Sequence, residues 1–273
     1  MAGPPQRGTI APVKTHFDVP YSRAFPDSRK LDLFMPDQPN GGGILFIHGG
    51  GWSGGSLRQW HDVADHFCRR GYVCASAEYR LVPETRFEGQ VEDVRLAMSF
   101  FRAHAGEHGF AAGRIAAVGS SAGGHLVAML ATIAPGDPLG LTDGLDVTDT
   151  RPNAVVCYCP VVTVHESDRL SEACRALMGA PESEAPGRYR AASPIDRVTG
   201  AEPPFLFLQG DADETTPPAQ AKTMSDKLRE SGVESELILL PGVGHGFGYG
   251  VTTAAQVEAV GHAERFLAEH LRE

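Results

Sequence analysis

The chain has 273 residues, of which 42% are hydrophobic and 21% charged, and its formal net charge at pH 7 is −10. This composition is typical of a globular protein and excludes a largely disordered chain. The negative charge opposes attraction to nucleic acid or to an anionic membrane surface, and no apolar stretch approaches the length of a bilayer-spanning helix.

The first residues, 1–8, contain prolines and glycines where an export signal would carry a continuous apolar segment. The five cysteines are odd in number and lack paired CxxC spacing, so neither a disulfide framework nor a zinc site is indicated. Cys157 and Cys159 lie two residues apart in an apolar run, and we expect both to be small buried side chains on one face of a strand. The sequence thus predicts a cytoplasmic protein with reduced thiols.

Two segments near the start of the chain, 15–18 and 30–35, predict an antiparallel hairpin at a sheet edge. After them, short apolar runs alternate with amphipathic segments, as in a parallel sheet that is covered on both faces. The expected strands are 44–47, 72–75, 115–118, 154–159, 205–208 and 237–240, and the expected helices lie between Ser56 and Gly71, around 91–101, and at 125–133, 218–230 and 254–271. This order predicts a mostly parallel α/β sheet with helices on both faces, in a single domain over residues 1–273.

One connection in this pattern is much longer than its neighbours. It covers residues 161–203, roughly forty residues where the usual connection has about two to six. Helix-like spacing appears inside it around 170–178. Because long insertions in compact domains often cover a site, we expect a small lid here.

The first chemical motif is the run from Gly119 to Gly124, which contains Ser121 between a predicted strand and a predicted helix. A GxSxG motif in this context is typical of a nucleophile elbow, a tight turn that exposes the serine hydroxyl. The small residues Gly119 and Gly123 allow the strand and the helix to approach closely. We therefore expect Ser121, and not Ser120, to be a nucleophile.

The second motif is His48-Gly49-Gly50-Gly51-Trp52, at the end of the strand 44–47. Glycines let backbone N–H groups face a ligand, and such donors stabilise the oxyanion of acyl transfer. We assign this role to the N–H groups of Gly50, Gly51 and Ala122. A plain flexible loop is the alternative, and a phosphate-binding loop fits poorly because no GKS or GKT follows. We expect His48 and Trp52 to pack and orient the loop, with Trp52 also at the substrate-binding surface.

The third motif supplies a base and an acid. His245 lies in a glycine-rich loop after the last predicted strand, and the order nucleophile, acid, base along the chain then requires a carboxylate between Ser121 and His245. The strand 205–208 leads into a group of carboxylates that includes Asp211 and Asp213. Their spacing alone does not decide between these two residues.

Taken together, the motifs resemble those of the bacterial hormone-sensitive-lipase-like esterases and of the short-lid feruloyl and acetylxylan esterase group. The likeness extends from about Gly43 onward and includes Glu78 to Glu84, Glu92 and Asp93. It implies the α/β-hydrolase fold and favours Asp213 as the acid. It also implies that Tyr79, Arg80 and Asp93 brace the sheet. Ser120, in place of a usual Asp, and Gln209, in place of a frequent His, favour the short-lid group.

The predicted function is hydrolysis of carboxylic esters through a Ser-His-Asp triad and an acyl-enzyme, without a cofactor and without a metal. The predicted lid is small, so we expect short-chain acyl or aryl esters as substrates. An amide hydrolase with the same fold, such as an arylformamidase or a peptidase, is the enzymatic alternative, and a non-catalytic small-molecule binding protein is the other. The expected partner is a small molecule, and whether the chain forms a homodimer stays open.

Overall fold

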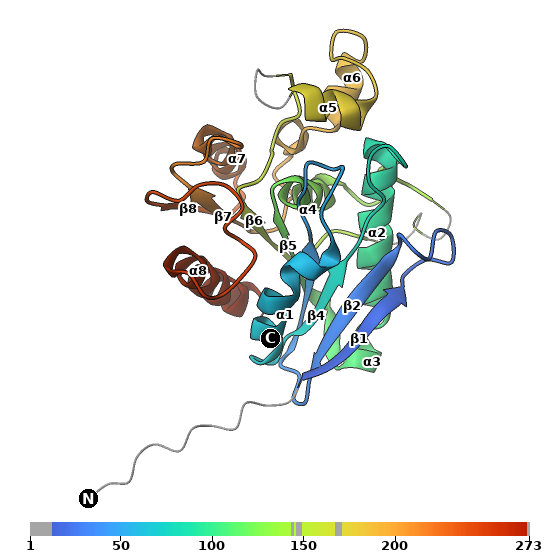
Figure 1. Cartoon of the computed structure of the whole chain (residues 1–273), viewed down its shortest axis with the longest axis vertical. Coiled ribbons are helices and arrows are strands. Elements are labelled where there is room, and N and C mark those ends of the chain that lie inside the picture. Colours follow the sequence, from blue (N-terminus) through green and yellow to red (C-terminus); the bar gives the residue numbers. More distant parts are fainter. Residues whose placement is uncertain (1–12, 143–144, 146–148, 167–170, 272–273) are drawn as a thin grey trace, which may run out of the picture.

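The computed structural model describes residues 13–142, 145, 149–166 and 171–271. In these residues an eight-stranded sheet has the strand order β1-β2-β4-β3-β5-β6-β7-β8. The strands are β1 (Val13–Pro20), β2 (Lys30–Pro36), β3 (Gly41–Ile47), β4 (Val73–Ala77), β5 (Phe110–Ser120), β6 (Ala154–Tyr158), β7 (Phe205–Gly210) and β8 (Ser235–Leu240). The hairpin β1–β2 is antiparallel and forms one edge, whereas the strands from β3 to β8 run parallel, as predicted (Figure 1).

Helices cover both faces of the sheet, which confirms the predicted α/β layering. One face carries the short helix η1 (Leu57–Trp60), α1 (His61–Cys68) and α8 (Ala254–His270), and the other carries α2 (Phe87–Ala103), α4 (Ala122–Thr132) and α7 (Pro218–Glu230). The short α3 (Ala105–His108) follows α2 and had no signal in the sequence, because four residues are too few to show helical periodicity.

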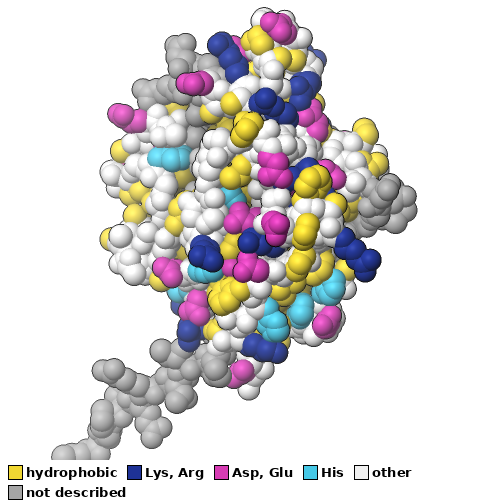
Figure 2. Space-filling view, turned by 45° about the vertical axis from the view of Figure 1, so that its right-hand side comes forward, with side chains coloured by type: hydrophobic (Ala, Val, Ile, Leu, Met, Phe, Trp, Pro, Cys, Tyr) yellow, Lys and Arg dark blue, Asp and Glu magenta, His cyan; other side chains and the backbone are white. Residues whose placement is uncertain are grey.

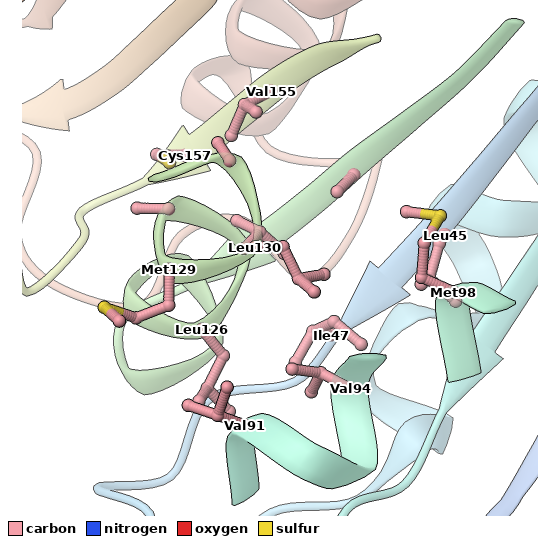
Figure 3. Packing of buried hydrophobic residues seen from close by; sticks show 14 of the residues in the cluster. Leu45, Ile47, Val91, Val94, Met98, Leu126, Met129, Leu130, Val155 and Cys157 are labelled. Atoms are coloured by element: carbon pink, nitrogen blue, oxygen red, sulfur yellow. The ribbon is translucent and has the colours of Figure 1, made fainter. Parts of the chain in front are cut away.

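The strands are apolar throughout because neighbouring residues point into different helix layers. Leu45 and Ile47 of β3 pack with Val155 of β6 against α2 and α4, as Figure 3 shows. Ile44 and Phe46, from the same strand β3, pack on the opposite face against α1. The sheet is therefore buried on both sides, and its carboxyl end is left to carry the site.

The prediction that Cys157 and Cys159 share one face of a strand is wrong. Both thiols are buried, but β6 ends at Tyr158, and Cys159 has a φ of 38° that turns the chain out of the strand. Cys157 packs in the layer with α2 and α4, whereas Cys159 packs in the layer with α1 and α8. All five cysteines are unpaired and buried.

The long connection 161–203 contains α5 (Ser171–Met178), α6 (Pro186–Ala191) and the short helix η2 (Pro194–Arg197). The predicted helix around 170–178 is thus present from Ser171, and Leu170 lies outside the described residues. Both α6 and η2 begin with a proline and are too short for a periodic pattern, so the sequence did not reveal them. In Figure 1, α5 and α6 lie together at the top of the molecule, and their role as a lid stays a prediction.

Figure 2 shows one face of the molecule, where Lys and Arg side chains lie among Asp and Glu side chains and do not form a separate basic patch. No helix in the described part of the chain combines the length and the apolar character that crossing a membrane requires.

Candidate active site

Ser121 lies at the sharp turn between the end of β5 and the start of α4. Its backbone has φ 55° and ψ −118°, a conformation that residues other than glycine rarely adopt and that costs about 1–3 kcal/mol. Two hydrogen bonds hold the turn: Ser121 N donates to Tyr158 O at 2.9 Å, and His125 N donates to Ser121 O at 2.9 Å. The strained turn places the serine side chain on the wall of a cavity.

The glycines on either side of Ser121 have a steric reason. A Cβ atom on Gly119 would lie 2.3 Å from Gly123 O, and a Cβ atom on Gly123 would lie 2.1 Å from Ile47 O. Both contacts are with backbone atoms, which cannot move aside as a flexible side chain can. Strand β5, helix α4 and the end of β3 therefore meet too closely for any side chain larger than hydrogen.

Three side chains from separate loops meet at this turn. His245 Nε2 lies 2.9 Å from Ser121 Oγ, and His245 Nδ1 lies 2.8 Å from Asp213 Oδ2. An ionised Asp213 accepts the hydrogen bond of Nδ1–H, which leaves Nε2 free to accept the hydroxyl proton of Ser121. This is the geometry of a serine nucleophile with a base and an orienting acid.

Asp211 and Asp213, the two candidate acids of the sequence, have different hydrogen-bond partners. Asp213 is buried against His245, whereas Asp211 Oδ1 accepts a hydrogen bond from Gly242 N at 2.6 Å in an exposed turn. The structure brings Asp213, and not Asp211, to the histidine, in agreement with what the family resemblance implies.

Asp213 is held by groups that the sequence analysis did not identify as part of the site. The N–H groups of Thr215 and Thr216 donate to Asp213 Oδ1, each at 2.9 Å. Gln209 Nε2 donates to Asp213 Oδ2 at 3.1 Å, and Thr216 Oγ1 lies 2.9 Å from the same oxygen. The two backbone bonds could have been predicted from the sequence, because an Asp side chain commonly accepts hydrogen bonds from backbone N–H groups two and three residues further along the chain. The role of Gln209 follows only from the folded chain.

The charges in this group shift two pKa values in opposite directions. Burial raises the pKa of Asp213, but the hydrogen bonds from His245 and Thr216 outweigh burial and hold it below 3.8. Burial lowers the pKa of His245, but contacts with Asp213 and Cys159 outweigh burial and raise it above 6.5. Asp213 therefore stays ionised, and the histidine is a stronger base than a free imidazole.

The glycine-rich loop after β3 lies beside Ser121. Gly50, Gly51 and Ala122 line the same cavity as Ser121 and His245. Within the described residues, none of the three has a hydrogen-bond acceptor for its backbone N–H. Gly50 has a φ of 124°, and a Cβ there would lie 2.2 Å from Gly54 O, so the loop conformation requires glycine. The three N–H groups are thus available to a ligand oxygen.

Tyr249 connects this loop to the loop of His245, a connection that the sequence analysis missed. Its hydroxyl accepts a hydrogen bond from Gly49 N at 2.6 Å, and its ring packs edge-on against Trp60, with the ring centres 4.9 Å apart. In the sequence, Tyr249 is marked only by its place between Gly248 and Gly250 in the loop after His245. This place does not indicate that Tyr249 contacts Gly49.

His48 and Trp52 have the orienting contacts that were predicted. His48 Nε2 lies 3.0 Å from Glu78 Oε2, and the His48 ring stacks on Tyr79 with the ring centres 4.4 Å apart. Trp52 Nε1 donates to His125 Nδ1 at 3.1 Å. Burial lowers the pKa of His125 to about 4, so its neutral ring can accept this bond. Trp52 is 1% exposed, although it also forms part of the cavity wall.

The resemblance implies a structural role for Tyr79, Arg80 and Asp93, and all three make buried contacts. Tyr79 donates from its hydroxyl to His48 O at 3.1 Å. The Asp93 carboxylate accepts from Arg29 Nε at 2.7 Å and from Arg80 Nε at 2.9 Å, and all three side chains are largely buried. This buried ion-pair group ties the segment after β4 to helix α2 and to the N-terminal hairpin.

The cavity above Ser121 has a volume of about 280 Å³. Its wall is mostly apolar, and the apolar contributors include Trp52, Val161, Ala173 and Tyr249. Val161 and Ala173 belong to the connection 161–203, and Ala173 lies on α5. The predicted lid segment thus contributes directly to the site.

A metal ion has one compact set of candidate ligands among the described residues, namely Cys159, Asp213 and His245. No sequence spacing indicated this set, because the three residues follow three different strands.

Comparison with known proteins places these motifs in a family. The family model with the description BD-FAE matches residues 31–228. The probable carboxylic ester hydrolase LipM of Mycobacterium tuberculosis is 32% identical over 238 residues, which cover 83% of this chain and 54% of that protein. Esterase LipC of the same organism is 34% identical over 75% of this chain and 52% of its own length. The chain thus spans about half the length of these curated relatives.

A solved structure resembles nearly the whole chain. Thermogutta terrifontis esterase 2 phosphonylated by sarin superposes with a TM-score of 0.80 at 25% identity, over 97% of this chain and 96% of that one. The same esterase with propionate bound superposes with a TM-score of 0.77 at 26% identity, over 95% and 94% of the two chains.

Proposed function

This chain belongs to the BD-FAE family and has the α/β-hydrolase fold, and we propose that it is a carboxylic ester hydrolase whose nucleophile is Ser121. The observation that carries the proposal is the continuous pair of hydrogen bonds from Ser121 Oγ through His245 to Asp213, at 2.9 and 2.8 Å. It provides a nucleophile, a base of raised pKa and a buried carboxylate in the required order.

In the first half of the reaction, Ser121 Oγ attacks the ester carbonyl carbon while His245 Nε2 takes the hydroxyl proton. Asp213 stabilises the imidazolium that forms. The carbonyl oxygen becomes an oxyanion and accepts hydrogen bonds from the N–H groups of Gly50, Gly51 and Ala122. In related chemistry, one such donor is worth about 3–4 kcal/mol. Collapse of the intermediate breaks the ester C–O bond, and the alcohol leaves with the proton from His245.

In the second half, water takes the place of the alcohol. His245 removes a proton from the water as the oxygen attacks the acyl carbon, and the same three N–H groups stabilise the second oxyanion. Ser121 then recovers its proton from His245, and the carboxylic acid is released. These steps use only groups of this chain and one water molecule.

We propose short acyl esters as substrates, with residues 161–203 acting as the lid. The cavity of about 280 Å³ is below the roughly 300–1,000 Å³ typical of sites for drug-sized ligands. Its apolar wall next to Ser121 suits a small acyl chain. The propionate bound to the related Thermogutta terrifontis esterase supports the same size class.

The test is hydrolysis of 4-nitrophenyl esters from acetyl to decanoyl, beside matching anilides and aryl formamides, by wild type and Ser121→Ala. We expect Ser121-dependent ester cleavage that is fastest for short acyl chains. Cleavage that favours anilides or formamides would instead support the amide-hydrolase alternative, and absence of turnover on every substrate would support non-catalytic binding.

A second readout does not depend on choosing the right ester. The relative was phosphonylated by sarin, so we expect a fluorophosphonate probe to add one phosphonyl group to the wild-type chain. Intact-protein mass spectrometry should show no adduct on Ser121→Ala and a full adduct on Ser120→Ala, the control for the neighbouring hydroxyl. An unmodified wild type, or a modified Ser121→Ala, would refute Ser121 as the nucleophile.

A further inference from the structure

Cys159 is a buried thiol next to the proposed triad, and the reaction does not use it. One potential ligand atom from each of Cys159, Asp213 and His245 lies within 4.8 Å of the other two. A single point therefore lies within about 2.8 Å of all three atoms, close to the roughly 2.0–2.3 Å at which Zn²⁺ is held by these side chains.

The chemistry of the three donors selects the kind of ion. A thiolate, an imidazole and a carboxylate are ligands of Zn²⁺ and its softer relatives, whereas Mg²⁺ and Ca²⁺ need mainly oxygen ligands. The negative charges of Cys159 and Asp213, once both are ionised, would also balance the charge of a divalent cation.

The surroundings keep the thiol in place beside the triad. Cys159 has a φ of 38°, and its carbonyl oxygen lies 3.0 Å from Thr216 Oγ1, the same hydroxyl that contacts Asp213. Its sulfur lies 3.7 Å from Ser120 Oγ, a weak hydrogen bond that a metal bond would readily replace. His245 forms part of the cavity wall, whereas Cys159 and Asp213 are buried and are not part of that wall, so an ion that enters the cavity meets His245 first.

We propose that Cys159, Asp213 and His245 form an inhibitory binding site for Zn²⁺ and related soft divalent cations. Binding releases to solvent the thiol proton of Cys159, and when Nδ1 of the neutral His245 ring binds the ion, the ring proton moves to Nε2. An imidazole that is held by a metal ion and separated from Asp213 no longer serves as the base for Ser121, so ester hydrolysis stops. The kinetic consequence rests on the proposed function, whereas the binding itself does not.

The kinetic test measures ester hydrolysis against Zn²⁺ concentration, with each variant normalised to its own metal-free activity. We expect Zn²⁺ to inhibit the wild type and a chelator to restore it. The concentration for half inhibition should rise at least about tenfold in Cys159→Ala and in Cys159→Ser, because a ligand is lost. Cys157→Ala, which removes the other thiol beside Tyr158, is the matched control and should behave as wild type. Equal sensitivity of all four proteins would overturn the proposal.

The binding test uses Cd²⁺ and needs no activity. Thiolate-to-cadmium charge transfer gives an ultraviolet absorption band, which we expect when Cd²⁺ is added to Ser121→Ala. The band should be absent from the double variant Ser121→Ala, Cys159→Ala and present in Ser121→Ala, Cys157→Ala. A band of equal strength in Ser121→Ala and in the double variant Ser121→Ala, Cys159→Ala would refute the site. A Cys159-dependent band would support it even if no ester proved to be a substrate.

Discussion

The Tyr249 hydroxyl accepts a hydrogen bond of 2.6 Å from the backbone N–H of Gly49, and this bond joins two loops that lie 200 residues apart in the chain. One loop carries the proposed oxyanion donors Gly50 and Gly51, and the other carries His245. The relative position of donors and base therefore depends on a tyrosine that has no place in the proposed chemistry itself.

Replacing Tyr249 by Phe should lower kcat by about tenfold and leave KM nearly unchanged, because a misplaced oxyanion donor weakens binding of the transition state more than binding of the ester. Steady-state kinetics on a short acyl ester measures both constants. Tyr158→Phe is the matched control, since the buried Tyr158 hydroxyl has no hydrogen-bond partner among the described residues. Equal losses in both variants would contradict the positioning role of Tyr249.

The two carboxylates at the end of β7 should differ strongly in their effect on the rate. Asp213→Asn should reduce kcat by roughly four orders of magnitude, because an amide stabilises the wrong tautomer of His245 and does not stabilise the imidazolium. Asp211→Asn removes a charge in an exposed turn but keeps an oxygen that can accept from Gly242 N, so it should change kcat less than about threefold. The reverse pattern in steady-state assays would mean that Asp211 is the acid.

The pH dependence should follow the raised pKa of His245. A protonated imidazole cannot accept the Ser121 proton, so kcat/KM should fall as the pH falls through this pKa. Because contacts with Asp213 and Cys159 outweigh the opposing effect of burial, the midpoint of that fall should lie above 6.5. In Asp213→Asn the residual activity should show a midpoint at lower pH, since the carboxylate no longer stabilises the imidazolium. A wild-type midpoint at or below 6.5 would disagree with this account.

Helix α5 should limit the length of the acyl chain through Ala173, which lines the cavity. Ala173→Leu adds three carbon atoms to the wall, and the ratio of acetyl to hexanoyl ester hydrolysis, in kcat/KM, should rise on the order of tenfold. Ala176→Leu enlarges a residue of the same helix that is not part of the cavity wall, and it should leave the ratio unchanged. If both substitutions shift the ratio equally, α5 acts through its overall position and not through Ala173.

Two glycine substitutions should have opposite effects on stability. Gly123→Ala places a Cβ atom 2.1 Å from Ile47 O, a backbone contact, and should lower the free energy of unfolding by at least about 1–3 kcal/mol. Gly261 lies in α8 with open space around its position, so Gly261→Ala should raise the free energy of unfolding by about 0.5–1 kcal/mol. Urea denaturation followed by circular dichroism measures both. A neutral Gly123→Ala would mean that β5 and α4 can move apart.

The amino-acid sequence was enough to predict the layered α/β fold, the positions of Ser121 and His245 in the chain, and the glycine loop at Gly50 and Gly51. These features are local: apolar runs of strand length, a serine between a strand and a helix, and glycines where a turn leaves no room for a side chain all follow from neighbouring residues. The same reasoning located the long connection 161–203. It did not reveal α6 or η2, because helices this short have too few residues to show a helical repeat of apolar positions.

Contacts between residues that lie far apart in the chain became visible only in the folded molecule. Spacing alone left Asp211 and Asp213 equal. The family resemblance favoured Asp213, and the folded loop shows that this carboxylate reaches His245. Two other contacts of the site also became visible only in the folded chain. Gly49 N donates to the Tyr249 hydroxyl, and Gln209 donates to Asp213. Both contacts depend on how the strands pack beside one another. The turn of the backbone at Cys159, which brings a thiol beside the triad, also follows from that packing and not from the spacing of the two cysteines.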